Sequence, residues 1–152
     1  MEAMKDFQHN KTDHDVEHWD SKLVDDAHDT KLERLSVLVS GAPIYIEGKL
    51  LSVPSLVDEY GNATSTGRAQ FEGAKDLIKS WDLKNSVTGL VFDTTASNSG
   101  VEQGACTRVD EWLGRPVLWL ACRHHVGELI AKASWYELVE EDLGPDNAFF
   151  LS

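Results

Sequence analysis

The sequence predicts an α/β domain in which a mixed five-stranded sheet is flanked by helices. Three observations lead to this fold class: strand-like bursts in the first third of the chain, helical periodicity after them, and two apolar runs that alternate with helical segments. The chain has 152 residues. A chain of that length is enough for one domain that buries about two-thirds of the surface of its unfolded form.

Three short segments near the start of the chain read as strands: Val16 to Leu23, Leu35 to Ser40, and Leu50 to Val57. Turn-forming residues bound them, among them Asp25-Asp26 and Gly41-Ala42-Pro43. Strands with such short links pair most readily as an antiparallel meander. We therefore expect the three segments to lie side by side in one half of the sheet.

The hydrophobic period changes to that of a helix between Ser65 and Asp82. Val87 to Phe92 follows as a compact run with β-branched residues, which is typical of a buried strand. The residues that form the helical stripe are Phe71, Ala74, Leu77, Ile78 and Trp81.

The last third of the chain repeats this alternation. Ser99 to Glu102 has the spacing of a capping box, which predicts a helix that runs to Leu113. Val117 to Cys122 reads as a second buried strand, and Arg123 to about Leu138 as a final helix. The order β-β-β-α-β-α-β-α is the arrangement of ribonuclease-H-like domains.

Charge and hydropathy restrict the class of protein. The formal net charge is −12, which argues against a free-standing nucleic-acid binder. The acids gather at both ends, so we expect a disordered acidic segment at 1–15, a core at 16–138 and an acidic tail at 139–152. No apolar stretch approaches the roughly 20 residues of a membrane span, and no secretory signal is visible. A nuclear or cytoplasmic protein with no membrane partner is expected.

Two aspartates have the placement that metal-dependent phosphodiester chemistry requires. Asp20 lies in the first predicted strand and Asp93 directly follows the fourth. Carboxylates at these neighbouring positions hold two Mg²⁺ ions that activate a nucleophile and stabilise the leaving oxygen. The structural alternative is that Asp93 is a turn residue and that Asp20 belongs to a segment rich in acids.

The loop after Asp93 lies where ligands bind in open α/β sheets, between a strand end and a helix N-terminus. Thr94, Thr95 and Asn98 offer hydroxyl and amide groups to a phosphate or to metal-bound water. The same groups equally suit a turn and a helix cap.

The cysteines and histidines predict little chemistry of their own. Cys122 and His125 form half of a zinc site, but the second pair of ligands is missing, so zinc is not expected. Cys106 falls in the middle of a predicted helix, where nothing activates it. His9, His14, His18 and His28 are interpreted as solvated residues among acids.

Residues 87–100, Gly104 to Cys106 and Leu118 to Leu129 resemble the catalytic core of hAT-type transposase-derived proteins. In that family a strand ends in Asp, a small polar loop with Asn follows, and a Cys-x-x-His element with a trailing Leu comes one helix and one strand later. The positions that match are Asp93, Asn98, Cys122, His125 and Leu129.

The resemblance implies a partial ribonuclease-H-like transposase core that uses Mg²⁺ or Mn²⁺ for DNA strand cleavage and transfer. Asp20 and Asp93 are then the first two members of an acidic triad. The family's third acid, a Glu, follows a large helical insertion for which this sequence has no room, and the family's zinc-binding DNA-recognition domain is absent. The local substitutes for the third acid are Glu128, Glu137 and Glu140.

We therefore expect a truncated transposon-derived protein that is inactive alone and binds DNA weakly or only in a longer form. The alternative from another class is a domesticated protein-interaction module without catalysis, which binds protein partners through the Trp119 strand edge or the acidic tail. A fragment with no selected function is the third possibility.

Overall fold

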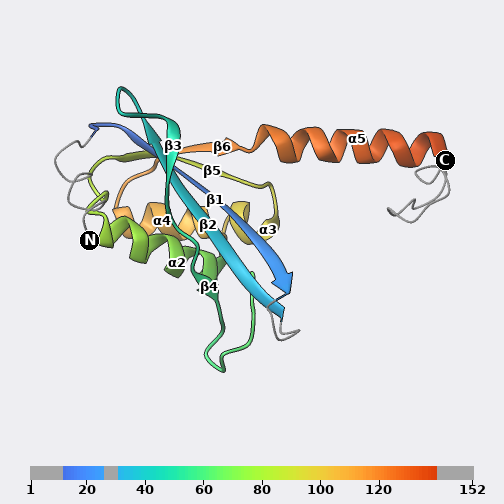
Figure 1. The fold of residues 1–152 in the computed structure, drawn as a ribbon, viewed down its shortest axis with the longest axis horizontal. Helices are drawn as coiled ribbons and strands as arrows, with labels where there is room; N and C mark the ends of the chain where they lie inside the picture. Colours follow the sequence, from blue (N-terminus) through green and yellow to red (C-terminus); the bar gives the residue numbers. More distant parts are fainter. Residues whose placement is uncertain (1–11, 26–30, 140–152) are drawn as a thin grey trace. The chain divides into compact units, whose positions relative to one another are not determined.

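The computed structural model describes residues 12–25 and 31–139. The chain divides into two compact units, one that ends at Cys122 and one that begins at Arg123. The first unit contains the sheet, and the described part of the second is helix α5 (Arg123–Val139) (Figure 1). Most of the predicted terminal segments, 1–15 and 139–152, lies outside the described residues.

The strands of the first unit form one mixed sheet of six strands in the order β3-β2-β1-β5-β6, with the short β4 beside β2 (Figure 1). β1 pairs with β2 in antiparallel fashion and β2 does the same with β3, whereas β5 runs parallel to β1 and to β6. This is the meander followed by two crossover strands that the sequence predicts, so the mixed α/β fold class with the ribonuclease-H-like strand order is confirmed, although the sheet has six strands and not the predicted five. The strands are β1 (Asp15–Asp25), β2 (Lys31–Gly41), β3 (Tyr45–Ser52), β4 (Ser55–Leu56), β5 (Val87–Phe92) and β6 (Leu118–Ala121).

The predicted third strand, Leu50 to Val57, is wrong at both ends. β3 begins five residues earlier, at Tyr45, and a break at Pro54 separates it from β4. Proline has no N–H to donate to a ladder, so the strand stops there, while the Pro54 carbonyl still accepts a hydrogen bond from the Leu35 N–H at 2.9 Å.

The first helix agrees with its prediction. Helix α2 (Gly67–Ser80) begins after Thr66, whose hydroxyl accepts a hydrogen bond from the Ala69 N–H at 3.3 Å.

The second predicted helix is wrong at its start. Ser99 does not cap a helix but ends the short helix α3 (Ala96–Ser99), and its hydroxyl donates to the Thr95 carbonyl. Helix α4 (Ala105–Leu113) begins only after Gly104 and ends at Gly114, as predicted. The sequence spacing of a capping box is present, but the Asp93-Thr94-Thr95 turn starts the helical backbone earlier and the 100–104 turn interrupts it.

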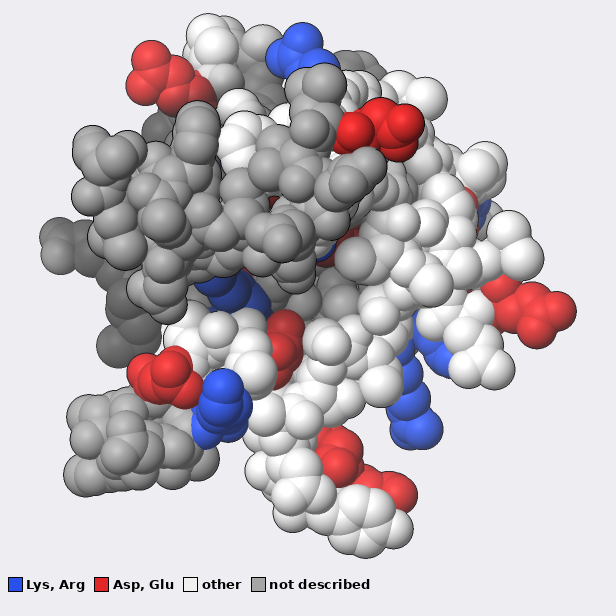
Figure 2. All heavy atoms as spheres, turned by 90° about the vertical axis from the view of Figure 1, so that its right-hand side faces the viewer, with Lys and Arg blue, Asp and Glu red and all other residues white. Residues whose placement is uncertain are grey.

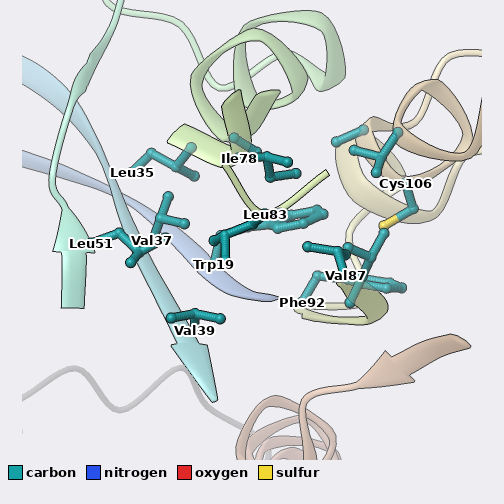
Figure 3. Close-up of a cluster of buried hydrophobic side chains, with 14 of the residues drawn as sticks. Trp19, Leu35, Val37, Val39, Leu51, Ile78, Leu83, Val87, Phe92 and Cys106 are labelled. Atoms are coloured by element: carbon teal, nitrogen blue, oxygen red, sulfur yellow. The ribbon is translucent and has the colours of Figure 1, made fainter. Parts of the chain in front are cut away.

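Helices α2 and α4 cover one face of the sheet, and the hydrophobic core lies between these helices and that face (Figure 3). Alternate residues of β2 point into it, and α2 contributes Ala74 and Ile78. Each large side chain buried in this way stabilises the fold by about 1.5–3 kcal/mol. The fully buried aliphatic residues include Leu35, Val37, Val39, Ile78, Leu83, Val87, Leu90 and Val109.

The prediction that the last strand is buried is wrong. β6 is exposed along its length, with Leu118 68% and Trp119 38% exposed. Among the described strands β6 has β5 as its one neighbour, so its outer edge has no ladder partner there. Helix α5 has nearly the predicted extent, and no helix of the described residues is long and apolar enough to cross a membrane.

Candidate functional site

The parallel pairing of β1 and β5 brings the two predicted aspartates to the same level. The register pairs Glu17 with Leu90 and His18 with Val91. One residue further along each strand, the rings of Trp19 and Phe92 stack with their centroids 6.1 Å apart. The next residues are Asp20, in the middle of β1, and Asp93, which directly follows β5.

One oxygen of Asp93 is held by the loop that follows it. Asp93 Oδ1 accepts hydrogen bonds from the Thr95 hydroxyl at 2.7 Å, the Thr95 N–H at 3.3 Å and Asn98 Nδ2 at 2.5 Å. No donor among the described residues reaches Oδ2. The carboxylate is therefore fixed in orientation while one of its oxygens stays available to a ligand.

Asn98 links Asp93 to the first strand. Its side chain is buried, 1% exposed, and its Oδ1 accepts a hydrogen bond from Trp19 Nε1 at 2.8 Å. One amide thus connects β1 through Trp19, helix α3 through its own backbone, and the end of β5 through Asp93. The sequence singles out Asn98 as a family match and as an amide of the polar loop, and the structure gives that position a structural role.

Two glycines allow the approach of backbone that holds α3 in place. A Cβ at Gly67, the first residue of α2, would lie 2.5 Å from the carbonyl oxygens of Ser97 and Gln103. A Cβ at Gly104 would lie 2.5 Å from the Asn98 carbonyl oxygen. Real Cβ atoms essentially never come so close to backbone, so glycine at both positions fixes the backbone around Asn98.

Asp20 points to the other face of the sheet from Trp19 and is exposed. It pairs through its backbone with Ser36 of β2, and no described residue hydrogen-bonds its carboxylate. His18 lies two residues before it on the same face. His18 is half-buried, and its Nε2 lies 2.7 Å from the Ser40 hydroxyl. Burial lowers the pKa of His18, so the interpretation of this histidine as a solvated residue is wrong.

Sequence reasoning missed Glu17, which faces the core. Its side chain is fully buried between Leu90 of β5 and Val39 of β2, and neither carboxylate oxygen has a hydrogen-bond partner among the described residues. Burial raises the pKa of Glu17 well above its ordinary value, which favours the protonated form in the folded chain. The alternation that it shares with Trp19 along β1 is the signal that points it inward.

The cysteines contribute no nucleophile to this site. Cys106 is fully buried, and its position as the second residue of α4 corrects the prediction that it lies in the middle of a helix. Burial, followed by the charge of Asp110, raises the pKa of its thiol, which keeps it protonated. Cys122 directly follows β6, and its N–H donates to the Phe92 carbonyl at 2.8 Å. His125 lies in the first turn of α5, and the expectation that Cys122 and His125 hold no zinc stays a prediction.

The residues at this site do not fit a complete two-metal centre. Within 12–25 and 31–139, no three His, Cys, Asp or Glu side chains are grouped so that they hold a metal ion. Asp20 and Asp93 are two carboxylates at corresponding positions of neighbouring strands, fewer than the ligands that a two-metal centre needs. Of the substitutes for a third acid, Glu128 and Glu137 lie on α5 and Glu140 lies outside the described residues.

Charge on the surface shown in Figure 2 is mixed rather than segregated. Among the described residues in that view, Lys and Arg side chains lie scattered between Asp and Glu side chains, and no continuous basic area forms (Figure 2). A phosphate backbone is bound by clustered Lys and Arg. The face in view therefore lacks, among its described residues, the charge pattern of a DNA track.

Comparisons with known proteins give a structural likeness but no match in sequence. No protein-family model and no curated protein sequence matches the chain. Among solved structures, it is similar to one described as the catalytic domain of Mos1 mariner transposase, at 13% identity and a TM-score of 0.46. The match covers 98% of this chain and 71% of that chain.

Proposed function

We propose that this chain is a ribonuclease-H-like domain of hAT-type transposase descent that holds one divalent cation weakly at Asp20 and Asp93 and does not cleave DNA by itself. The observation that supports the proposal is the β1–β5 register, which brings the backbones of Asp20 and Asp93 to corresponding positions on neighbouring strands. The Trp19–Asn98–Asp93 connection supports it, because that connection orients one of the carboxylates.

The chemistry of the donors sets what the site does. Mg²⁺ and Mn²⁺ prefer carboxylate oxygens, and in metal-dependent phosphoryl transfer two such ions activate the nucleophile and stabilise the leaving oxygen. Asp93 presents Oδ2 while Oδ1 stays engaged with Thr95 and Asn98. Asp20 presents an exposed carboxylate. Two protein ligands are too few to hold two ions, so binding without turnover is the expected behaviour.

The hAT assignment and the DNA partner belong to the proposal as well. Asn98, Cys122 and His125 match the family's positions in sequence, and the buried amide of Asn98 explains why a small polar loop needs that residue type. A net charge of −12 weakens any interaction of this chain with DNA. We therefore expect DNA binding that is weak or present only in a longer form.

Paramagnetic Mn²⁺ tests the cation site directly. Titration of the ¹⁵N-labelled chain should broaden the amide signals around Asp20 and Asp93 first, with a dissociation constant on the order of 10⁻³ M. Asp20→Asn and Asp93→Asn should each abolish this selective broadening. The matched control is Glu102→Gln with Glu111→Gln, two exposed acids outside the site. Broadening that survives both aspartate substitutions would overturn the site.

A nuclease assay tests the second half of the proposal. The chain is incubated with single- and double-stranded DNA and Mg²⁺ or Mn²⁺, beside Asp93→Ala. We expect no cleavage above the level of the variant. Metal-dependent cleavage by the wild-type chain that is lost in Asp93→Ala would show that it is an active nuclease and contradict the proposal.

A further inference from the structure

A groove lies between helix α2 and the segment that joins β4 to it, and neither Asp20 nor Asp93 lines it. Its volume is about 650 Å³, within the range of about 300–1,000 Å³ that binding pockets have. Apolar side chains from both walls line it. They are Pro54, Leu56 and Val57 on the β4 side and Ala69 and Leu77 on α2.

Hydrogen bonds within residues 57–63 fix the conformation of the outer wall of the groove in the unbound chain. Val57 pairs with Ala63 in a β-bridge, and the N–H of Asp58 donates to the Asn62 carbonyl at 2.8 Å. Asp58 Oδ1 accepts hydrogen bonds from the N–H groups of Tyr60 and Asn62, and these bonds lower the pKa of Asp58. A preformed wall reduces the ordering cost of binding.

The rim of the groove carries an excess of negative charge. Four acids line it against one base, Arg68. Asp58 is engaged in its own turn and Glu72 pairs with Lys75, whereas no described residue pairs with the exposed side chains of Glu59 or Asp76. Such a rim repels phosphate groups and attracts Lys and Arg. The apolar side chains that line the groove favour a partner that also carries apolar side chains between its Lys or Arg residues.

We propose that this groove is a docking site for a segment of another protein in which apolar residues alternate with Lys or Arg. The proposal goes beyond the cation site and does not depend on it. The chain's own C-terminal residues are an unsuitable occupant, since residues 137–152 contain five acids and no base. The same complementarity that favours a basic segment disfavours that tail.

Fluorescence anisotropy with labelled short peptides tests the docking chemistry. A peptide of alternating Lys and Leu should bind, and added salt should weaken it. Peptides of alternating Lys and Ser, or Glu and Leu, should bind at least about tenfold more weakly, because each lacks one half of the complementarity. Equal binding of the Lys/Leu and Lys/Ser peptides would reduce the groove to a general charge effect and overturn the proposal.

Charge reversal with a matched control locates the binding. Glu59→Lys with Asp76→Lys should weaken the Lys/Leu peptide about tenfold, whereas Glu102→Lys with Glu111→Lys changes net charge equally at exposed positions outside the groove and should leave affinity within about twofold. Equal losses in both pairs would contradict the assignment. Thermal melts confirm that each variant is folded.

The apolar half is tested at Val57, which is 49% exposed. Val57→Ser removes methyl groups from the wall and keeps the backbone bridge, so it should also weaken the binding of the Lys/Leu peptide. In the wild type, the amide signals that shift when this peptide is added should be confined to residues 54–59 and 68–77. Shifts elsewhere, or self-association of the chain that the peptide fails to displace, would sink the proposal.

Discussion

Glu17 and Asp93 are acids on neighbouring strands of one sheet, and their surroundings are opposite. Asp93 follows β5 at the strand end, where three hydrogen bonds converge on one of its oxygens. Glu17 lies near the start of β1, fully buried, and neither of its oxygens has a partner among the described residues. Burial and the hydrogen-bond donors nearby, more than the shared sheet, therefore decide which acid is available to a ligand and which is enclosed in the core.

Trp19 stands between the two environments. It shares the inward face of β1 with Glu17, and its ring stacks on Phe92 of β5. Its indole N–H donates a hydrogen bond to Asn98 Oδ1, and Asn98 Nδ2 donates a hydrogen bond to Asp93. The packing of the core and the orientation of the site therefore depend on the same side chain.

The largest effect is expected at Trp19. Trp19→Ala should lower the free energy of unfolding by about 3–5 kcal/mol, because it opens a cavity in the core. It also leaves the buried Asn98 oxygen without its donor. Denaturant-induced unfolding measures the loss.

Trp19→Phe separates the two contributions. This variant keeps most of the ring packing against Phe92 and loses the N–H, so it should cost less, about 1–3 kcal/mol. A loss in Trp19→Ala no greater than in Trp19→Phe would show that packing at this position contributes little.

The second effect has the opposite sign. Glu17→Leu should raise the free energy of unfolding at pH 7 by about 1–3 kcal/mol, because it replaces a buried polar group without partners by an apolar one of similar size. The control is Glu33→Leu on β2. Glu33 is also buried, but its oxygens are not among the fully buried atoms that lack a hydrogen-bond partner. Destabilisation by Glu17→Leu would mean that the carboxyl group has a partner in solution.

The pH dependence of stability sharpens this prediction. The folded chain keeps the Glu17 proton above pH 4.5, the ordinary pKa, at which the unfolded chain releases it. Raising the pH therefore favours the unfolded state, by up to about 1.4 kcal/mol per pH unit, until the folded group also ionises. The difference in free energy of unfolding between Glu17→Leu and the wild type should therefore grow with pH across this window. A difference that does not change with pH would show that folding does not raise the pKa of Glu17.

The order of the sheet could be predicted because its strands have distinct compositions. Val87 to Phe92 reads as buried from its β-branched residues alone, and Gly114 ends α4 as expected. The division of the third strand could not be predicted from hydropathy, since Leu50 to Val57 stays mostly apolar on both sides of Pro54. The break follows from a missing N–H donor and not from a change in polarity.

The candidate site was only half accessible from the sequence. Asp93 and Asn98 stand out because both lie in one short polar loop. The bond from Trp19 to Asn98 joins residues 79 apart, and no local pattern announces it. Glu17 was missed because acids are usually read as surface residues, although its alternation with Trp19 points inward.

A third effect is expected at Asn98. Asn98→Ala should cost about 1–3 kcal/mol, because it leaves the buried indole N–H of Trp19 unpaired and removes one donor from Asp93. Asn85→Ala removes the same amide from an exposed turn and should stay within about 0.5 kcal/mol. Equal losses in the two variants, measured by denaturant unfolding, would contradict the bridging role of Asn98.

The smallest effects on stability are expected at Asp93 and Asp20. In chelator, Asp93→Asn should cost about 1 kcal/mol, because the charge that strengthens its hydrogen bonds to Thr95 and Asn98 is lost. Asp20→Asn should change stability by less than about 0.5 kcal/mol, since its carboxylate is exposed. Mn²⁺ at a concentration equal to its dissociation constant should then stabilise the wild type by about 0.4 kcal/mol and neither variant. If Asp20→Asn keeps the Mn²⁺ increment, Asp20 is no ligand and the register alone has aligned the two side chains.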